Sequence, residues 1–232
     1  MNFPLLTPPE TEALLLSLQI AFWSVAIGLP FGIAAAWLLA RRDFFGKALL
    51  DSLIHLPLVV PPVVVGYLLL VTLGRSGWLG GWLFDAFGIT VIFTWKGAAI
   101  AAGIMAFPLM VRAIRLSMEA VDQRFEVAAR TLGASRTGVF FSITLPLSLP
   151  GILTGAVLAY ARALGEFGAT ITFVSNIPGE TRTLPLALFT FTQTPGGEDS
   201  AARLVVISFI LAIAAMLLSE FIARRVRRRI EA

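Results

Sequence analysis

The chain alternates between apolar runs of membrane-spanning length and shorter polar segments. A hydrocarbon layer about 30 Å thick requires roughly 20 helical residues to cross it. The apolar runs of this length lie between Glu12 and Arg41, between Asp51 and Arg75, from about Ile89 to Val111, from Arg136 past Arg162 towards Val174, and from Leu204 to Ala223. The pattern therefore predicts an all-α integral membrane protein with about five transmembrane helices.

One further apolar stretch, Leu184 to Thr194, is too short to cross a membrane. Pro185 lies near its start, and Pro195, Gly196 and Gly197 follow its end, so that turns are expected on both sides. The stretch predicts a short helix on the outer side, either re-entrant or interfacial. A buried core helix of an outer loop fits the same pattern.

Proline residues interrupt several predicted spans, and each one removes a backbone hydrogen-bond donor. They are Pro57, Pro61 and Pro62 in the second span, Pro108 in the third, and Pro146 and Pro150 in the fourth. These spans are therefore expected to kink.

Two GxxxG pairs, Gly28 with Gly32 and Gly151 with Gly155, allow another backbone to approach closely. Each pair fits a dimer face. Each also fits ordinary helix packing, because glycine is common in membrane helices.

The basic residues predict the orientation of the chain. Of the 18 Lys and Arg residues, three lie between Arg41 and Lys47, five between Arg112 and Arg136, and five between Arg224 and Arg229. Positive residues are retained in the cytoplasm during membrane insertion, so these segments are expected there. An odd number of crossings then places the amino terminus outside and the carboxyl terminus in the cytoplasm.

The composition fits a single transmembrane domain over residues 1–232, since 57% of the residues are hydrophobic and 14% are charged. The net charge of +4 comes from basic residues dispersed between apolar runs. Membrane orientation accounts for these residues, and no nucleic-acid partner is expected. The chain has no cysteine and only one histidine, His55, so neither a disulfide nor a metal site is expected.

The sequence contains no motif for nucleotide binding or catalysis. Gly46-Lys47 lacks the upstream glycine of a P-loop and is followed by Ala48. The patterns HExxH and GxSxG are also absent. We therefore expect a protein that is not an enzyme and holds no cofactor.

The predicted cytoplasmic segment between the third and fourth spans reads as two short helices joined by a turn. The stretch QRFEVAARTLG predicts a helix that ends at Gly133, because glycine accepts the left-handed conformation of a helix end. Ser135 is placed to cap the helix that follows. Ala128 and Ala129 give the first helix a flat surface on which another backbone could lie. A solvated loop also fits this stretch.

The spacing of residues in this segment resembles the EAA loop of permease subunits in bacterial ABC importers. That loop has the consensus EAA, three residues, Gly, nine residues and Ile-x-Leu-Pro. The matching residues are Ala128, Ala129, Gly133, Ile143, Leu145 and Pro146. One departure is that Val127 stands at the consensus glutamate, and the acidic residue, Glu126, comes one place earlier.

The resemblance continues through most of the chain. HLPLVVPPVVVGYLLL at 55–70, FPLMVRAIRL at 107–116 and ARALGEFGATITFVSNIPGETRTLP at 161–185 are similar to the molybdate permease subunits of ABC transporters. The GEFGA core is also similar to sulfate and thiosulfate permeases.

This resemblance implies a type I ABC importer permease of the bacterial inner membrane that moves molybdate. It implies a cytoplasmic coupling loop at about 117–141, including Glu126, that contacts a separate ATPase dimer carrying ATP and Mg²⁺. The remaining implied partners are a second copy of the permease, an external molybdate-binding protein and membrane lipid. A sulfate, thiosulfate or tungstate permease, an ATPase-independent anion transporter and a purely structural membrane subunit are the competing hypotheses.

Four polar residues in and after the fourth span, with the glycine between them, are the candidates for a substrate path or gate: Arg162, Gly165, Glu166, Thr170 and Thr172. Arg162 and Glu166 are spaced i, i+4 and are expected on one helix face, beside the anion path or as a structural pair.

Two further sets of residues are candidates for a contact or a pair, because of where they lie in the chain. The outer residues Gly179, Glu180 and Arg182 are candidates for contact with the binding protein. Asp51 and His55, also i, i+4, predict a structural pair, and a proton relay fits the same spacing.

Overall fold

The computed structural model describes residues 6–230, with the side chains of residues 222, 223 and 225–230 outside the description. All regular elements of this described part are helical. The prediction of an all-α protein is therefore confirmed. Four of the arginines that predicted the orientation, Arg225 and Arg227 to Arg229, have side chains outside the described residues.

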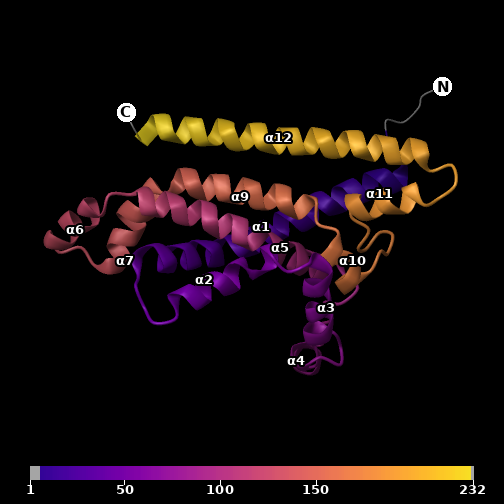
Figure 1. Cartoon of the computed structure of the whole chain (residues 1–232), viewed down its shortest axis with the longest axis horizontal. Helices are drawn as coiled ribbons and strands as arrows, with labels where there is room; N and C mark the ends of the chain where they lie inside the picture. Colours follow the sequence, from indigo (N-terminus) through magenta and orange to yellow (C-terminus); the bar gives the residue numbers. More distant parts are fainter. Residues whose placement is uncertain (1–5, 231–232) are drawn as a thin grey trace.

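Three helices form the centre of the molecule. They are α1 (Pro8–Arg41), α5 (Trp95–Ala120) and α9 (Leu149–Leu164), and they lie side by side, with α12 (Glu198–Ile230) along the outer side of α9 (Figure 1). Their contacts are built largely on small residues, among them the fully buried Ala21, Ala98 and Ala101. Small residues let backbones approach closely, which stabilises helix pairs that lipid surrounds.

Both GxxxG pairs serve this packing within the chain. A side chain added at Gly28 or Gly32 would meet Met110 of α5, at 3.2 and 3.1 Å. A side chain at Gly151 would meet Ser117 of α5, and one at Gly155 would meet the Met110 backbone oxygen at 3.0 Å. The pairs are therefore occupied by α5 rather than left for a second copy.

The described helices give between three and five spans, so the predicted number, about five, is the upper count. Three are long and apolar enough by themselves: α1, α5 and the Glu198–Phe221 part of α12. Two more spans arise if each pair of helices separated by a bend is counted as one. The first pair joins α2 (Lys47–His55) and η1 (Leu56–Leu58) to α3 (Pro62–Leu73) across 108°. The second joins Arg136–Leu147 to α9 across 67°.

The bends fall at the prolines that predicted them. Pro61 ends the turn after η1, and Pro62 begins α3. The segment before α9 consists of α7 (Arg136–Val139), the π-helical turn η2 (Phe140–Thr144) and α8 (Leu145–Leu147), with Pro146 in α8 and Pro150 in the first turn of α9. A proline cannot donate to the preceding turn, so it starts a new helix more readily than it continues an old one.

Two predicted boundaries were wrong. The third span begins at Trp95 rather than near Ile89, because Phe93 has a φ of 59° and the Thr94 side chain caps the helix. It continues to Ala120, so the predicted coupling loop, taken to start at 117, begins inside α5. The fourth span is not continuous to Val174, since α9 ends at Leu164 and α10 (Gly168–Val174) is a separate helix.

The short helix is confirmed as α11 (Leu184–Thr192). Leu184, Leu186 and Ala187 are buried, and the helix contacts α1 and α12. This is the arrangement expected of a buried core helix.

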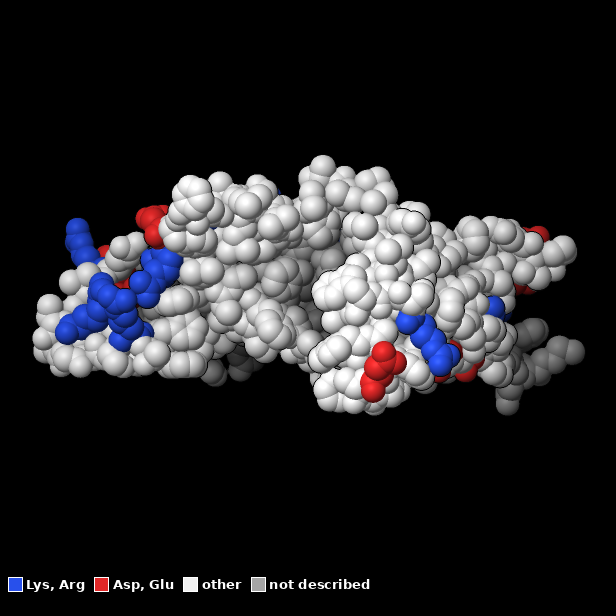
Figure 2. All heavy atoms as spheres, turned by 90° about the horizontal axis from the view of Figure 1, so that it is seen from below, with Lys and Arg blue, Asp and Glu red and all other residues white. Residues whose placement is uncertain are grey.

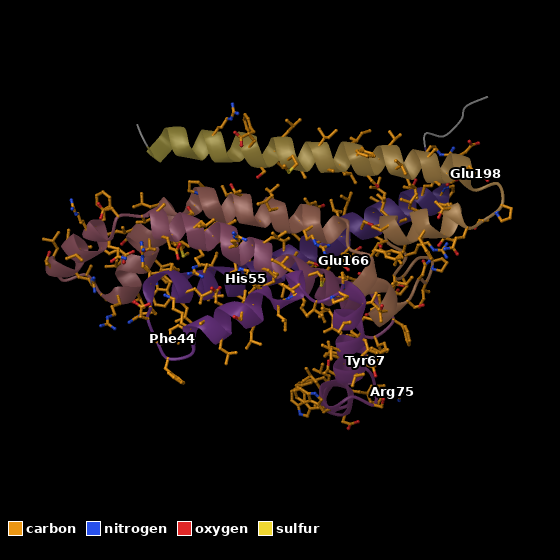
Figure 3. All side chains as sticks on the ribbon, viewed as in Figure 1. Phe44, His55, Tyr67, Arg75, Glu166 and Glu198 are labelled. Carbon is orange, nitrogen blue, oxygen red and sulfur yellow. The ribbon has the colours of Figure 1, made fainter. Side chains whose placement is uncertain are left out.

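An arm made of α3 and α4 (Trp78–Phe87) projects from the body (Figure 1). Tyr67 and Arg75 lie along it in Figure 3. The arm is attached mainly through α10, where the buried Gly66 faces Ala169. The rest of its surface is strongly apolar, with exposed Val63, Tyr67, Leu68, Val71, Trp78 and Trp82.

Gly66→Ala is expected to loosen the arm and destabilise the protein by about 1–3 kcal/mol, the usual cost of overpacking. The added Cβ would lie 2.6 Å from the Ala169 backbone oxygen. Thermal unfolding of the detergent-purified protein checks this result. Gly81→Ala in α4 is the matched control, because its Cβ would meet only the Arg75 oxygen at 3.4 Å. Equal unfolding temperatures for the two variants would contradict the proposed attachment.

Candidate functional site

A polar knob, residues 122–139, forms one end of the molecule (Figure 1). Its first helix is α6 (Gln123–Thr131), and Asp122 caps it by accepting a hydrogen bond from the Arg124 N–H at 2.9 Å. Gly133 ends it with a φ of 89°, and the Ala134 N–H donates to the Ala129 oxygen at 3.0 Å. This backbone pattern closes a helix when glycine occupies the left-handed position.

The second helix of the knob begins as predicted. The Ser135 Oγ accepts a hydrogen bond from the Gly138 N–H at 3.1 Å and caps α7. The predicted helix, turn and helix are therefore confirmed. The turn fixes the direction of α6 relative to α7 and η2.

Helix α6 has two different faces. With 3.6 residues per turn, one face carries Phe125, Ala128, Ala129 and Leu132, and the opposite face carries Gln123, Glu126 and Arg130. The Phe125 side chain is 59% exposed and that of Leu132 88%. Large apolar side chains exposed on a polar knob are typical of a surface that binds another protein.

The opposite face anchors the knob. The Glu126 Oε1 accepts hydrogen bonds from Arg41 Nε at 2.8 Å and from Thr144 Oγ1 at 2.9 Å. Arg41 also donates to the Val121 oxygen at 3.0 Å. The Arg41 and Glu126 side chains are only 7% and 15% exposed. Glu126 therefore connects the knob to the end of α1 and to η2.

The remaining residues of the predicted coupling set lie outside the knob. Ile143 is in η2, and Leu145 and Pro146 are in α8, where Ile143 and Leu145 are half-buried and Pro146 is exposed. These residues form the bent approach to α9. The predicted set thus divides into three parts: Ala128, Ala129 and Gly133 on the knob, of which Ala129 is half-buried; the anchoring Glu126; and the residues of the approach to α9.

Sequence reasoning missed two kinds of residue here. Phe125 and Leu132 are seven positions apart, a spacing that places them on the same helix face and could have been recognised. Arg41 and Thr144 carry no such signal, because Arg41 is 85 residues from Glu126 along the chain.

The polar residues of the predicted path surround the break between α9 and α10. Arg162 lies in the last turn of α9, which ends at Leu164. The exposed Gly165 is the first residue after the helix, and Glu166 is the second. The prediction that Arg162 and Glu166 share one helix was wrong, because α9 ends between them. They nevertheless form an ion pair, with 2.7 Å between Arg162 Nη1 and Glu166 Oε2.

Glu166 has a second partner. Its Oε1 accepts a hydrogen bond from the Ala169 N–H at 2.9 Å, in the first turn of α10. The carboxylate, labelled in Figure 3, therefore bridges the end of α9 and the start of α10. The side chain of Glu166 is 2% exposed and that of Arg162 29%. Of the two charged groups, the exposed one is therefore the Arg162 guanidinium.

The two threonines of the predicted path belong to α10. Thr170 is buried, and the half-buried Thr172 donates from Oγ1 to the Gly168 oxygen at 2.8 Å. Thr172 also lies close to Gly66 of α3. The structure thus places these threonines at the junction with the arm.

The predicted docking residues form a tight outer turn. The Ile177 oxygen accepts from the backbone N–H groups of Glu180, Thr181 and Arg182. Glu180 Oε1 accepts from the Trp95 N–H at 3.2 Å, and Arg182 Nε donates to Asn176 Oδ1 at 3.0 Å. Gly179 is exposed at the tip. This turn lies at the opposite end of the molecule from the knob (Figure 1).

Asp51 and His55 lie together as predicted, with 3.1 Å between His55 Nδ1 and Asp51 Oδ1, and the hydrogen bond of Nδ1 is to the Asp51 backbone oxygen at 2.8 Å. Arg115 of α5 also contacts Asp51, at 3.0 Å from Nη1 to Oδ2. Asp51 therefore joins α2 to α5, which supports the structural interpretation. Within the described residues no group of His, Asp and Glu side chains is arranged to hold a metal ion.

Charged side chains lie at the two ends of the face shown in Figure 2, with an uncharged band between them. Such a band is expected of a surface in contact with lipid. At the knob end, Asp43 lies in the loop between α1 and α2, and its Oδ1 accepts a hydrogen bond from Nζ of Lys47, the first residue of α2, at 2.9 Å. This hydrogen bond holds the pKa of Asp43 below its ordinary value.

Residues 28–231 match the family described as binding-protein-dependent transport system inner membrane component. The chain is 64% identical to the molybdenum transport system permease protein ModB of Escherichia coli strain K12, over 97% of this chain and 98% of the relative. It is 56% identical to ModB of Haemophilus influenzae, over 95% and 96% of the two chains.

The fold has a match among solved structures. A bacterial alginate ABC transporter, solved in complex with an alginate pentasaccharide-bound periplasmic protein, aligns with 95% of this chain and 80% of the matched chain. The TM-score is 0.74 and the sequence identity 17%, so the likeness concerns the fold. The fold is that of the type I ABC importer permeases.

Proposed function

Because this chain belongs to the family of binding-protein-dependent transport system inner membrane components, we propose that it is the permease subunit of a molybdate ABC importer. The observation that carries this proposal is the 64% identity, over almost the whole of both chains, to a molybdenum transport permease. The exposed apolar face of the knob supports it, since a permease without a P-loop needs a surface that contacts its ATPase.

The energy source is a separate ATPase dimer that holds ATP and Mg²⁺, while this chain performs no bond chemistry and needs no cofactor. In this proposal the coupling loop, at about 117–141, contacts the ATPase through Phe125, Ala128, Ala129 and Leu132. Gly133 sets the angle of that face. When the ATPase moves the knob, Glu126 transmits that movement to α1 and η2 through its contacts with Arg41 and Thr144.

Two copies of the chain form the transport path in this proposal. The support is that the arm of α3 and α4 projects from the body, so that its exposed apolar side chains are free to pack against a second copy as well as against lipid (Figure 1). An external molybdate-binding protein delivers the anion to the turn that contains Gly179, Glu180 and Arg182. Alternating access follows when the helices bent at 108° and 67° rock against each other.

We place the amino terminus outside and the carboxyl terminus in the cytoplasm of a bacterial inner membrane. The support is that the knob and the Arg41–Lys47 segment, both with more basic than acidic residues, lie at the same end of the molecule (Figure 1). Basic segments are retained on the cytoplasmic side.

Uptake competition tests the substrate. In a deletion strain that carries this permease and its partners, unlabelled molybdate is expected to suppress uptake of labelled molybdate far more strongly than sulfate does. Equal suppression by sulfate would favour a sulfate or thiosulfate permease, and stronger suppression by tungstate would favour a tungstate permease.

Two further experiments test whether the chain depends on an ATPase and whether it transports at all. Purified protein that moves molybdate along a gradient in liposomes without an ATPase would support an ATPase-independent transporter. Unchanged uptake after deletion of the chain would support a purely structural subunit.

A further inference from the structure

A polar cavity of about 170 Å³ lies between the knob and the end of α1. Its lining includes Trp37 and Arg41 of α1 and Arg42, the residue after α1. Glu126 and Arg130 of α6 and Arg136 of α7 line the other side. The volume is several times the ~30 Å³ that one water molecule occupies in the liquid. The cavity can therefore hold a small polyatomic group.

The lining carries far more positive than negative charge. It contains the arginines at 41, 42, 130 and 136, and Glu126 is its one acidic side chain. That carboxylate already accepts hydrogen bonds from Arg41 and Thr144 through Oε1. Four guanidinium groups around one carboxylate leave an excess of positive charge, which favours an anionic ligand.

Three of these arginines, at 42, 130 and 136, have no ion-pair partner among the described residues, although Arg130 Nε donates to the Glu126 backbone oxygen at 3.3 Å. Within residues 6–230, neither Arg42 nor Arg136 has a described carboxylate within 4.0 Å. The Arg42 guanidinium instead lies over the Trp37 ring, 5.4 Å from its centroid. This contact orients a cation at the wall of the cavity.

The cavity is distinct from the exposed face of α6. Glu126 and Arg130 line it, whereas Phe125 and Leu132 point from the opposite side of the helix. A protein that covers the exposed face would leave the cavity on its other side, toward α1. Trp37 and Arg41 are at the end of a membrane-length helix, where interfacial aromatic and basic side chains meet phosphate groups.

We propose that this cavity binds a phosphate-type oxyanion, held by Arg42 and Arg136 with Arg41 and Arg130 beside them. Guanidinium groups recognise such anions with paired hydrogen bonds. The anion can come from the headgroup of an acidic phospholipid or from a free oxyanion in the cytoplasm. In either case, it would join α1 to both helices of the knob and stiffen the connection that Glu126 already makes.

Two binding measurements on the purified full chain distinguish the sources. One titrates detergent-solubilised protein with radiolabelled inorganic phosphate. The other compares lipid retained after reconstitution in phosphatidylcholine alone and in phosphatidylcholine mixed with phosphatidylglycerol. Retention of phosphatidylglycerol without phosphate binding identifies a lipid headgroup, and phosphate binding identifies a free oxyanion. Both results support the site.

The test variant is Arg42→Gln with Arg136→Gln, which is expected to weaken binding by about tenfold or more. The matched control is Arg112→Gln with Arg124→Gln, which removes the same charge from exposed arginines that do not line the cavity. The control is expected to bind as the wild type does. Competition by sulfate against phosphate on the wild-type chain gives a measurement independent of how the variants fold.

Three outcomes overturn the proposal. The first is a wild-type chain that retains neither phosphate nor phosphatidylglycerol. The second is an equal loss of binding in the test and control variants, since net charge alone would then explain it. The third is loss of ATPase co-purification in the test variant while its anion binding stays at the wild-type level, because the arginines would then contact acidic groups of the ATPase.

Discussion

Gly133→Val is expected to remove most of the ATPase that co-purifies with this chain, while the chain still inserts into the membrane. The residue has a φ of 89°, and nothing lies within 4 Å of the position of an added Cβ. The cost therefore comes from the backbone, at about 1–2 kcal/mol, or a factor of roughly 5–30 in an equilibrium constant. Valine is β-branched and disfavours a positive φ, so the turn is expected to adopt another conformation in this variant. A different turn points α6 in a different direction. Co-purification from solubilised membranes measures the loss.

Gly46→Val provides the matched control for this prediction. Gly46 has a φ of 88° and open space around its Cβ position, and it lies before α2 at the same end of the molecule. This variant carries the same backbone strain outside the knob and is expected to retain the ATPase. Gly133→Asn should retain much of it, because asparagine tolerates the left-handed conformation. Equal loss in the Gly46 and Gly133 variants would show that the knob does not hold the ATPase.

Glu166→Ala is expected to abolish molybdate uptake and to destabilise the protein by about 3 kcal/mol, the lower end of the usual cost of breaking a buried ion pair. The substitution leaves Arg162 without its carboxylate and removes the acceptor of the Ala169 N–H. The lower end applies because the Arg162 side chain is 29% exposed. Uptake assays and thermal unfolding measure the two effects.

A double variant separates the two interpretations of this pair. Arg162→Gln with Glu166→Gln removes both charges and should recover much of the stability lost in Glu166→Ala. Recovered stability with recovered uptake would identify a structural pair, and recovered stability without uptake would identify Arg162 as part of the anion path. Glu220→Ala breaks the exposed Arg224 pair in α12 and serves as the control, with an expected change of about 0–1 kcal/mol.

The features that depend on residues close together along the chain could be predicted from the sequence. The apolar runs indicated up to five spans, and the prolines at 61, 62, 146 and 150 marked the two places where helices are bent. The turn at Gly133 and the cap at Ser135 were also predictable, because a left-handed residue and a hydroxyl acceptor act within a few positions of themselves.

The tertiary structure alone decided which of these elements meet. The sequence placed Glu126 beside Ala128 in one motif, whereas the folded chain turns it to the other side of α6, onto Arg41 and Thr144. It also showed that both glycine pairs face α5. These results depend on contacts between residues tens of positions apart. Local patterns fix the length and ends of a helix, but only packing against distant helices fixes the direction in which each face points.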